Sequence, residues 1–246
     1  MRRSNGKAET YALLDAIGAP GPVWRRARGW AAVEAAAREL DYPGAEVAVK
    51  PLESSGSRGF RILSASADPL QQLLNNRPGV APAIQLEELV ALLPEDGGPE
   101  LLVMELARGK ERTIDGIARG GRIVLGHPKT REAMRAGLAM YFETLDDAAL
   151  MDVAASIVRE LELDHFFNIQ LVGDTVIEIN PRISTVVYQD DLNLPYLGVK
   201  RALGEISDEE LIGLRTRIQP GRTSLRYFDQ VDFDGPVVDS SDHARA

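Results

Sequence analysis

The segment FNIQLVGDTVIEINPR, at residues 167–182, places the strongest constraint on the fold of this chain. Two apolar runs, Phe166–Val172 and Val176–Pro181, make up most of it, and both have the length and composition of a strand. Gly173 and Asp174 separate the runs and are residue types that favour a tight turn. The segment therefore predicts a β-hairpin.

The polar residues of this hairpin are spaced so that they can share one face. Glu178 and Asn180 are two residues apart, so both side chains leave the same face of a strand, and Arg182 follows if the strand continues. Gln170, on the first strand, joins this face only if the connection has an odd number of residues, for which Gly173–Thr175 is the shortest case. A two-residue turn would send Glu178 to the opposite face.

A carboxylate and two amides on one wall are oxygen ligands of the kind that Mg²⁺ accepts, usually beside substrate phosphates. The pattern therefore predicts a magnesium site at Gln170, Glu178 and Asn180. The alternative is an ordinary hairpin with a solvated polar face, because a short motif is a hypothesis until its structural context is known.

A second informative segment lies upstream, after a short β-branched strand. The run VAVKP at Val47–Pro51 includes Lys50, and ESSGSRGF at Glu53–Phe60 follows almost directly. A turn rich in glycine and serine can point several backbone N–H groups at one phosphate, and the lysine adds a positive charge. The segment is neither a P-loop nor a dinucleotide-binding fingerprint, because it joins strand to strand. A plain flexible hairpin would have a similar composition.

The order of these segments resembles that of the ATP-grasp superfamily, and within it the carbamoyl-phosphate-synthetase-like branch. The order begins with Lys7 and VAVKP, continues with SSGSRGF and with LLVMELARGKE at Leu101–Glu111, and ends with FNIQ and IEINPR. IEINPRIS is the most specific part of the resemblance. The resemblance implies an α+β fold, in which two α+β subdomains with mainly antiparallel sheets clasp a nucleotide.

The resemblance also implies a division of the chain. The expected parts are an N-terminal helical segment at 1–20, a small lid subdomain with the glycine-rich loop at 21–103, a large subdomain with the metal and phosphate site at 104–205, and a C-terminal helix or strand with a mobile tail at 206–246. Family members usually carry a further N-terminal α/β domain that has no counterpart here. The chain is therefore expected to be a fragment, half of a split pair or a reduced relative.

Individual residues take roles by the same resemblance. Those implied at the nucleotide are Lys7, Lys50, Ser54, Ser55, Gly56, Ser57 and Gly59 for the phosphates, Met104, Glu105 and Leu106 for adenine, and Glu111 for the ribose. Those implied as ligands of one or two Mg²⁺ or Mn²⁺ ions are Gln170, Glu178 and Asn180.

The remaining implied residues belong to the reacting groups. Lys50, Arg131 and Arg182 are implied as catalytic, because the two arginines face the transferred phosphate or the acyl substrate. Lys129 and Arg135 stay open as alternatives to Arg131. Arg182 and Asn193 are implied as possible substrate contacts, although Asn193 would also suit the cap of a turn.

The function that the resemblance implies is an ATP- and Mg²⁺-dependent ligase that joins a carboxylate to an amine or a thiol through an acyl-phosphate intermediate. Phosphoryl transfer needs charge neutralisation and positioning more than an acid–base pair, and lysines, arginines and Mg²⁺ provide both. Two alternatives are an ATP-binding regulatory or structural module without complete catalysis and one half of a split enzyme. A scaffold that resembles the family by chance is a third.

Turn-forming residues and hydrophobic periodicity predict the main elements outside the hairpin. Helical spacing indicates helices at Ala8–Ile17 and Gly29–Leu40, and the clearest amphipathic stripe lies at Leu150–Leu161. Alternation over Ser224–Phe233 predicts a late strand, and Asp239–Ala246 has the composition of a mobile tail.

Composition excludes several classes of protein. The chain has 28 Lys and Arg against 37 Asp and Glu, a formal net charge of −9, which argues against a general nucleic-acid or anionic-membrane surface. The absence of cysteine excludes disulfides, thiolate metal sites and a cysteine nucleophile. With neither a signal-peptide core nor 18 consecutive apolar residues, the sequence predicts a cytoplasmic enzyme. The expected partners are ATP, a small carboxylate and an amine, with a partner domain or a homo-oligomer also possible.

Overall fold

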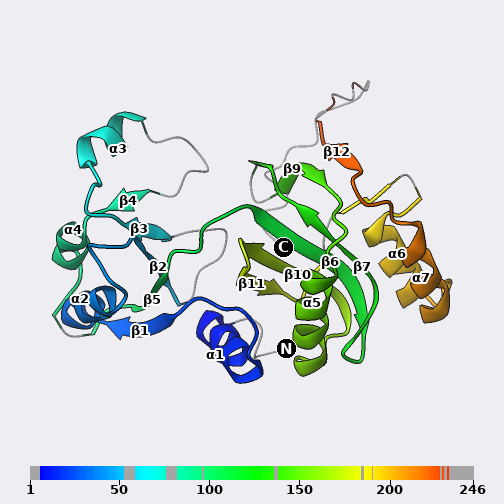
Figure 1. Ribbon diagram of the computed structural model, residues 1–246, viewed down its shortest axis with the longest axis horizontal. Helices are drawn as coiled ribbons and strands as arrows, with labels where there is room; N and C mark the ends of the chain where they lie inside the picture. Colours follow the sequence, from blue (N-terminus) through cyan, green and yellow to red (C-terminus); the bar gives the residue numbers. More distant parts are fainter. Residues whose placement is uncertain are drawn as a thin grey trace.

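The computed structural model describes residues 6–52, 59–75, 82–95, 97–135, 138–183, 186–189, 191–227, 229 and 232. Within these residues the chain forms three β-sheets and the helices that pack on them (Figure 1). Among the strand pairs of the described residues, all but one are antiparallel. The predicted α+β class with mainly antiparallel sheets is confirmed.

The N-terminal sheet has five strands in the order β1-β5-β2-β3-β4. Alternate residues of its middle strands, such as Val47 and Val103, pack on the buried side of α2 at Val33 and Ala37. Its elements are β1 (Trp24–Arg28), α2 (Trp30–Glu39), β2 (Val47–Pro51), β3 (Arg61–Leu63), α3 (Pro69–Asn75), β4 (Ala83–Ile84), α4 (Leu86–Ala91) and β5 (Glu100–Glu105). The parallel pair is β3 with β4.

The central sheet has four strands in the order β11-β10-β6-β7. Helix α5 covers one of its faces, and the Asp147 carboxylate begins this helix by accepting the Leu150 N–H at 3.0 Å. The elements are β6 (Glu111–Arg119), β7 (Arg122–Thr130), α5 (Ala148–Glu160), β10 (His165–Val172) and β11 (Thr175–Asn180). The amphipathic helix predicted at Leu150–Leu161 is α5, which begins two residues earlier, at Ala148, and ends one residue earlier, at Glu160.

The opposite face of the central sheet is divided into an apolar half and a polar half. Ile117 and Leu125 form the apolar half, which packs on Leu197 and Leu211. Those residues belong to α6 (Leu194–Ala202) and α7 (Asp208–Leu214), which a 3₁₀ turn, η2 (Arg215–Arg217), follows. The third sheet lies beside the polar half and has the order β12-β9-β8, formed by β8 (Ala133–Arg135), β9 (Leu138–Glu143) and β12 (Thr223–Leu225).

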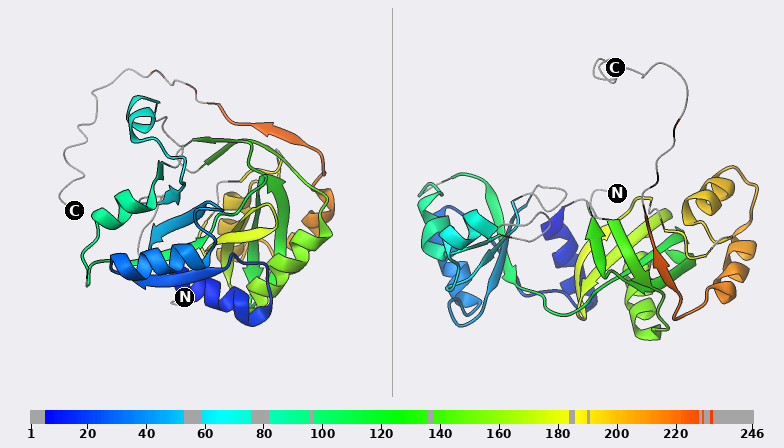
Figure 2. Two further views of the ribbon diagram at one scale, coloured as in Figure 1. Left: turned by 60° about the vertical axis from the view of Figure 1, so that its left-hand side comes forward. Right: turned by 90° about the horizontal axis from the view of Figure 1, so that it is seen from above.

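Helix α1 (Lys7–Ile17) lies between the N-terminal and central sheets (Figures 1 and 2). Its Tyr11 and Leu14 belong to one buried cluster with Leu102 of the N-terminal sheet and Ile169 and Val176 of the central sheet. A single shared core therefore sets the relative position of the two sheets. Residues 106–110 connect β5 to β6 across the same boundary.

The late strand is shorter than the sequence predicts. Alternation indicated a strand over Ser224–Phe233, whereas β12 ends at Leu225. β12 pairs with β9 through Thr223, Ser224 and Leu225. The Arg226 N–H still donates to the Met140 carbonyl of β9 at 2.7 Å, but the strand does not continue over residues 226–227. The predicted tail at Asp239–Ala246 lies outside the described residues. No helix in the described ranges has the length and apolar character to cross a membrane.

Candidate functional site

The β10–β11 hairpin has a two-residue turn, yet Gln170 and Glu178 are direct partners. Val172 pairs with Thr175 across the turn, and a β-bulge then leaves Ile177 without a partner residue. The prediction that a two-residue turn would separate Gln170 from Glu178 was wrong, because the extra residue of the bulge restores the register. The bulge also places the Ile177 carbonyl within 2.8 Å of the Tyr11 hydroxyl, which donates to it.

Amide groups from both strands meet on the polar half of this face. Asn168 is the direct partner of Asn180, as Gln170 is of Glu178. The Asn168 Oδ1 accepts hydrogen bonds from the Gln170 Nε2 at 2.8 Å and from the Asn180 Nδ2 at 3.2 Å. Gln170, Glu178 and Asn180 therefore lie together, and Glu178 is the exposed member of the three.

A buried ion pair supports this amide cluster from the neighbouring strands. The Lys129 Nζ lies 2.9 Å from the Asp115 Oδ2, and the two side chains are 4% and 2% exposed. The Asn168 Nδ2 donates to the Asp115 Oδ1 at 2.8 Å and to the Thr113 Oγ1 at 2.7 Å. The Lys129 Nζ also lies 5.1 Å from the centre of the Phe142 ring. Burial lowers the pKa of Lys129, although Asp115 opposes that effect.

A second charged group lies where the N-terminal sheet meets the hairpin. The Lys50 Nζ donates to the Tyr11 hydroxyl at 2.6 Å and lies 4.8 Å from the centre of its ring. The pKa of Lys50 is lowered to about 8, chiefly by burial and also by the charge of Lys7, whereas Glu178 opposes this shift. Burial lowers the pKa of Lys7 as well, and Glu178 again opposes the effect. Lys7, Lys50 and Glu178 therefore interact electrostatically although they come from three separate elements.

Tyr11 is the residue that connects these elements. Its hydroxyl accepts from Lys50 of β2 and donates to the Ile177 carbonyl of β11, so it links α1 to these two strands. Burial raises the pKa of Tyr11 well above its ordinary value, so the hydroxyl stays protonated and keeps its donor.

The expected catalytic arginines lie in different environments. The Arg131 side chain is 8% exposed, and its Nε lies 3.5 Å from the Glu111 Oε2. Arg182 is exposed and follows the end of β11. Arg226, which follows β12, is within electrostatic range of Asp115, and burial lowers its pKa. The structure therefore brings Arg131 and Arg226 toward the buried Lys129–Asp115 pair.

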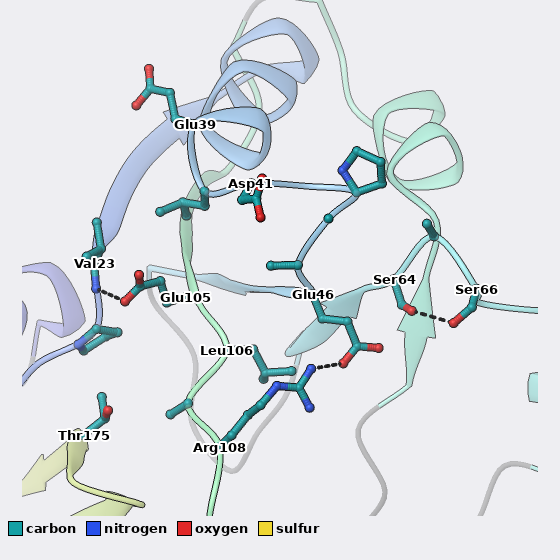
Figure 3. A pocket seen from close by; sticks show the side chains of 17 residues that line it. Val23, Glu39, Asp41, Glu46, Ser64, Ser66, Glu105, Leu106, Arg108 and Thr175 are labelled. Carbon is teal, nitrogen blue, oxygen red and sulfur yellow. Dashed lines mark hydrogen bonds and ion pairs between the residues drawn. The ribbon is translucent and has the colours of Figure 1, made fainter.

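The expected adenine-contacting residues stand where β5 leads into the connection between the sheets. Met104 is buried in the shared core, and the Glu105 carboxylate accepts the Val23 N–H at 3.0 Å. The Glu105 N–H donates to the Val23 carbonyl at 2.9 Å, so this N–H is not available to a base. Leu106 and Glu105 line a cavity of about 890 Å³ (Figure 3).

This cavity is acidic and does not contain the cluster of charges described above. Its walls include the Glu46–Arg108 ion pair, with Oε2 and Nη2 2.7 Å apart, and the Ser64–Ser66 hydroxyl pair (Figure 3). Lys7, Lys50 and Glu178 are not among its lining residues. The chemistry of the hairpin, and not this cavity, therefore marks the candidate site.

Two further expectations concern single positions. Asn193 begins α6, and its Oδ1 accepts the Tyr196 N–H at 3.0 Å, so its side chain caps a helix.

Gly59 has a φ of 75°, and a Cβ there would lie 2.6 Å from the Pro51 Cγ. Glycine is thus required next to the strand that carries Lys50. The other expected loop residues lie outside the described ranges: Ser54, Ser55, Gly56 and Ser57.

Sequence reasoning missed four residues of the site. Asn168 carried a usable signal, because it precedes Gln170 by two positions and so shares its face. Tyr11 and Arg226 carried none, because their contacts depend on the packing of a distant helix and strand. Asp115 carried none either, because the lysine that it pairs with, Lys129, lies on another strand.

The donor set suits a hard divalent cation that shares its coordination with a phosphate. Gln170 and Asn180 direct their NH₂ groups at Asn168, which leaves their carbonyl oxygens available beside the Glu178 carboxylate. In the described part of the chain no three carboxylate, histidine or cysteine side chains are placed to hold a metal by themselves. A single carboxylate with two amide oxygens fits Mg²⁺, which keeps waters and relies on phosphate oxygens.

Comparison with solved structures supports the fold. L-amino acid ligase from Bacillus licheniformis matches 90% of this chain and 52% of its own length, with a TM-score of 0.56 and 18% identity. D-alanyl-alanine synthetase A from Vibrio cholerae matches 88% and 65%, with a TM-score of 0.54 and 12% identity. N5-carboxyaminoimidazole synthetase from Staphylococcus aureus, complexed with ADP, matches 90% and 53%, with a TM-score of 0.51 and 14% identity.

The chain spans about half to two thirds of the length of these proteins. The family described as ATP-grasp in the biosynthetic pathway with Ter operon matches residues 98–220, which is half of the chain and includes β6, β10, β11 and the whole amide cluster. The resemblance of the sequence motifs to the ATP-grasp superfamily is confirmed, and this chain belongs to the ATP-grasp family.

Proposed function

We propose that this chain binds ATP with Mg²⁺ between its N-terminal and central sheets and transfers the γ-phosphate to a carboxylate, whose acyl group then passes to an amine or a thiol. The observation that carries the proposal is the junction at Tyr11, whose hydroxyl accepts from Lys50 and donates to the Ile177 carbonyl, next to Glu178. Glu178 also acts on the pKa values of Lys7 and Lys50. Two cations beside a carboxylate suit a polyphosphate with its metal, because the cations face phosphate oxygens and the carboxylate faces the metal.

The nucleotide would lie along the boundary between the sheets. Lys7 and Lys50 would bind the phosphates, and the glycine-rich loop with Ser54, Ser55, Gly56, Ser57 and Gly59 would cover them. Adenine would approach the connection at Met104, Glu105 and Leu106. Glu111 would reach the ribose, and its 3.5 Å contact with Arg131 is long enough to be exchanged for a ribose hydroxyl.

Gln170, Glu178 and Asn180 would hold Mg²⁺ or Mn²⁺, which when bound neutralises charge on the β- and γ-phosphates. The carbonyl oxygens of the two amides support this assignment, since their NH₂ groups are occupied by Asn168. Arg131 is held nearly buried on the same face and Arg182 follows the metal-ligand strand. Both would stabilise the transferred phosphoryl group, with Lys50 on its other side.

In the first step a carboxylate oxygen forms a bond to the γ-phosphorus, and the bond from that phosphorus to the β–γ bridging oxygen breaks, which releases ADP. In the second step the amine or thiol attacks the acyl carbon, phosphate leaves with the bonding electron pair, and the proton of the amine or thiol passes to solvent. Protein groups contribute position and positive charge to both steps, and the site excludes water that would hydrolyse the acyl phosphate.

A second candidate function is ATP binding without complete catalysis, either as a regulatory module or as one half of a split enzyme. The structural neighbours are one and a half to two times as long as the part that this chain matches, so the activity of those whole proteins is a proposal for this chain. In this reading residues 21–103 and 104–205 still form the lid and the large subdomain, and Asn193 retains only its capping role.

The test is a measurement of ADP and phosphate release with ATP and Mg²⁺ across a panel of small carboxylates and amines. Carboxylate-dependent ADP release that needs Lys50 and Glu178 supports the ligase. Tight ATP binding without carboxylate-dependent release supports the binding module. Failure to bind ATP at all overturns both.

A further inference from the structure

We propose that Asn168 is a positioning residue that fixes which way the amides of Gln170 and Asn180 face, and that the buried Lys129–Asp115 pair fixes Asn168. The inference rests on the proposed Mg²⁺ site and identifies what makes two amides act as oxygen ligands there. Asn168 directs both of its polar atoms at other side chains of the sheet, so it acts on the site through Gln170 and Asn180.

The donor and acceptor roles in these hydrogen bonds are set by the Lys129–Asp115 pair, because each of its members can act in only one role. A lysine ammonium only donates, and an ionised carboxylate only accepts. The Lys129 Nζ lies 2.9 Å from one Asp115 oxygen, and both side chains are almost fully buried. Asp115 therefore presents an acceptor, Oδ1, to Asn168 at 2.8 Å.

An amide that faces an acceptor must turn its nitrogen toward it. The Asn168 Nδ2 donates to Asp115 and also to the Thr113 Oγ1 at 2.7 Å. Its Oδ1 consequently points in the other direction, toward Gln170 of the same strand and Asn180 of β11. There it accepts from the Gln170 Nε2 and the Asn180 Nδ2, at 2.8 and 3.2 Å.

The Asn168 oxygen in turn fixes the orientation of the Gln170 and Asn180 amides, because it can only accept. The NH₂ groups of Gln170 and Asn180 both face Asn168, so their carbonyl oxygens face away from it. If either amide turned over, an N–H group would replace an oxygen at the metal and the carbonyl would meet the Asn168 oxygen. Mg²⁺ accepts oxygen ligands, so correct amide direction is a condition for binding.

Burial explains why an ion pair serves as the anchor. A buried pair is weak support for stability, because desolvation offsets its attraction, but it can specify a single arrangement of polar groups. A neutral residue at 115 with its own amide could donate or accept, and the direction of the three amides would no longer be set. Residues that orient ligands from outside the metal's own coordination shell typically change metal affinity by about 10- to 100-fold.

The first test examines the protein without metal or nucleotide. In ¹⁵N spectra of the side-chain amides, the Gln170 and Asn180 NH₂ signals should show slow hydrogen exchange, and Asn168→Leu should speed the exchange of both. The matched control is Thr113→Val, which removes one acceptor of Asn168 but leaves Asp115. Fast exchange of both NH₂ groups in the wild-type protein would overturn the proposal, whatever the protein does with ATP.

The second test measures Mn²⁺ affinity by EPR in the presence of a non-hydrolysable ATP analogue. Asn168→Leu is expected to weaken Mn²⁺ binding by about tenfold or more. It should leave affinity for the metal-free analogue within about threefold, as expected of a residue that acts only through ligand orientation. Thr113→Val should change Mn²⁺ affinity by less than about threefold, because Asp115 still sets the direction of Asn168.

If Asn168→Leu fails to fold, the double variant Asp115→Asn with Lys129→Met takes its place, since it removes both charges and leaves the amides intact. It should weaken Mn²⁺ binding while all three ligands remain. Unchanged Mn²⁺ affinity in a folded variant, or an equal loss of affinity for the metal-free analogue, would overturn the proposal. If the wild-type protein binds neither analogue nor Mn²⁺, the proposed function fails, and the exchange experiment still decides the orientation.

Discussion

The Lys50 Nζ donates a 2.6 Å hydrogen bond to the Tyr11 hydroxyl and so joins the second strand of the N-terminal sheet to helix α1. The same hydroxyl donates to the Ile177 carbonyl in the bulge of the β10–β11 hairpin. One phenol thus holds Lys50, a proposed phosphate contact, and the hairpin that carries the proposed metal ligands in a fixed relation.

Loss of the Lys50 charge should weaken ATP binding much more than loss of an exposed lysine charge. Lys50→Ala removes a charge-assisted contact in a half-buried position, which corresponds to a change on the order of 10- to 100-fold in dissociation constant. Lys110→Ala is the matched control, because Lys110 is exposed and its loss should change the constant by less than about fivefold. Calorimetric titration with ATP measures both, and equal constants would refute the assignment.

ATP affinity should fall as the pH rises through about 8, because burial lowers the pKa of Lys50 to about 8 and a neutral amine no longer attracts phosphate. Lys50→Arg should flatten this dependence, since arginine stays charged. In the free protein the effect on stability has the opposite sign. The unfolded lysine binds its proton up to about 10.5, so between about 8 and 10.5 the stability should rise with pH. Titrations from pH 7 to 9.5 that show no decline in wild-type affinity would contradict the first part.

Removal of the Tyr11 hydroxyl should destabilise the protein. Tyr11→Phe leaves the half-buried Lys50 amine and the Ile177 carbonyl without this partner, at a cost of about 1–3 kcal/mol in unfolding free energy. Tyr196→Phe is the control, because Tyr196 is 59% exposed and its change should stay within about 0.5 kcal/mol. Urea unfolding followed by circular dichroism gives both values, and similar losses in the two variants would show that the junction is not important.

A side chain at position 59 should disturb the strand that carries Lys50. Gly59→Ala places a Cβ 2.6 Å from the Pro51 Cγ at a φ of 75°, so the strand end must move. Gly97→Ala is matched in conformation, with a φ of 81°, but its Cβ would have nothing within 4 Å. Backbone strain of about 1–2 kcal/mol is common to both variants. Only Gly59→Ala should also weaken ATP binding, and an unaffected ATP affinity would contradict the contact.

The sequence by itself determined the features that depend on neighbours along the chain. Strand alternation grouped Glu178 with Asn180, because the period of two is a property of any extended backbone. The apolar stripe at Leu150–Leu161 located α5, because a period of 3.6 is likewise local. The ordered motifs from Lys7 to Arg182 indicated the family, which the match over residues 98–220 shows.

Other features depended on pairing partners that local patterns do not contain. WRRAR at Trp24–Arg28 lacks the apolar alternation of a strand, yet it forms β1 because it pairs with β5 along its whole length. Arg26 also forms an ion pair with Glu100 of that strand. The bulge at Ile177 reversed the expected effect of a two-residue turn. The Ile177 carbonyl accepts a hydrogen bond from Tyr11 of α1, 166 positions earlier in the chain.

Only the tertiary structure decided the direction of the hydrogen bonds in the site and the pKa values of its charged groups. Asp115 and Lys129 become a buried pair because two strands place them on one face and the third sheet lies beside it. Lys50 acquires a lowered pKa because α1 and the hairpin remove water from it. Desolvation and hydrogen-bond direction are set by atoms far apart in the sequence, so they follow from the packing of the sheets and not from the motifs themselves.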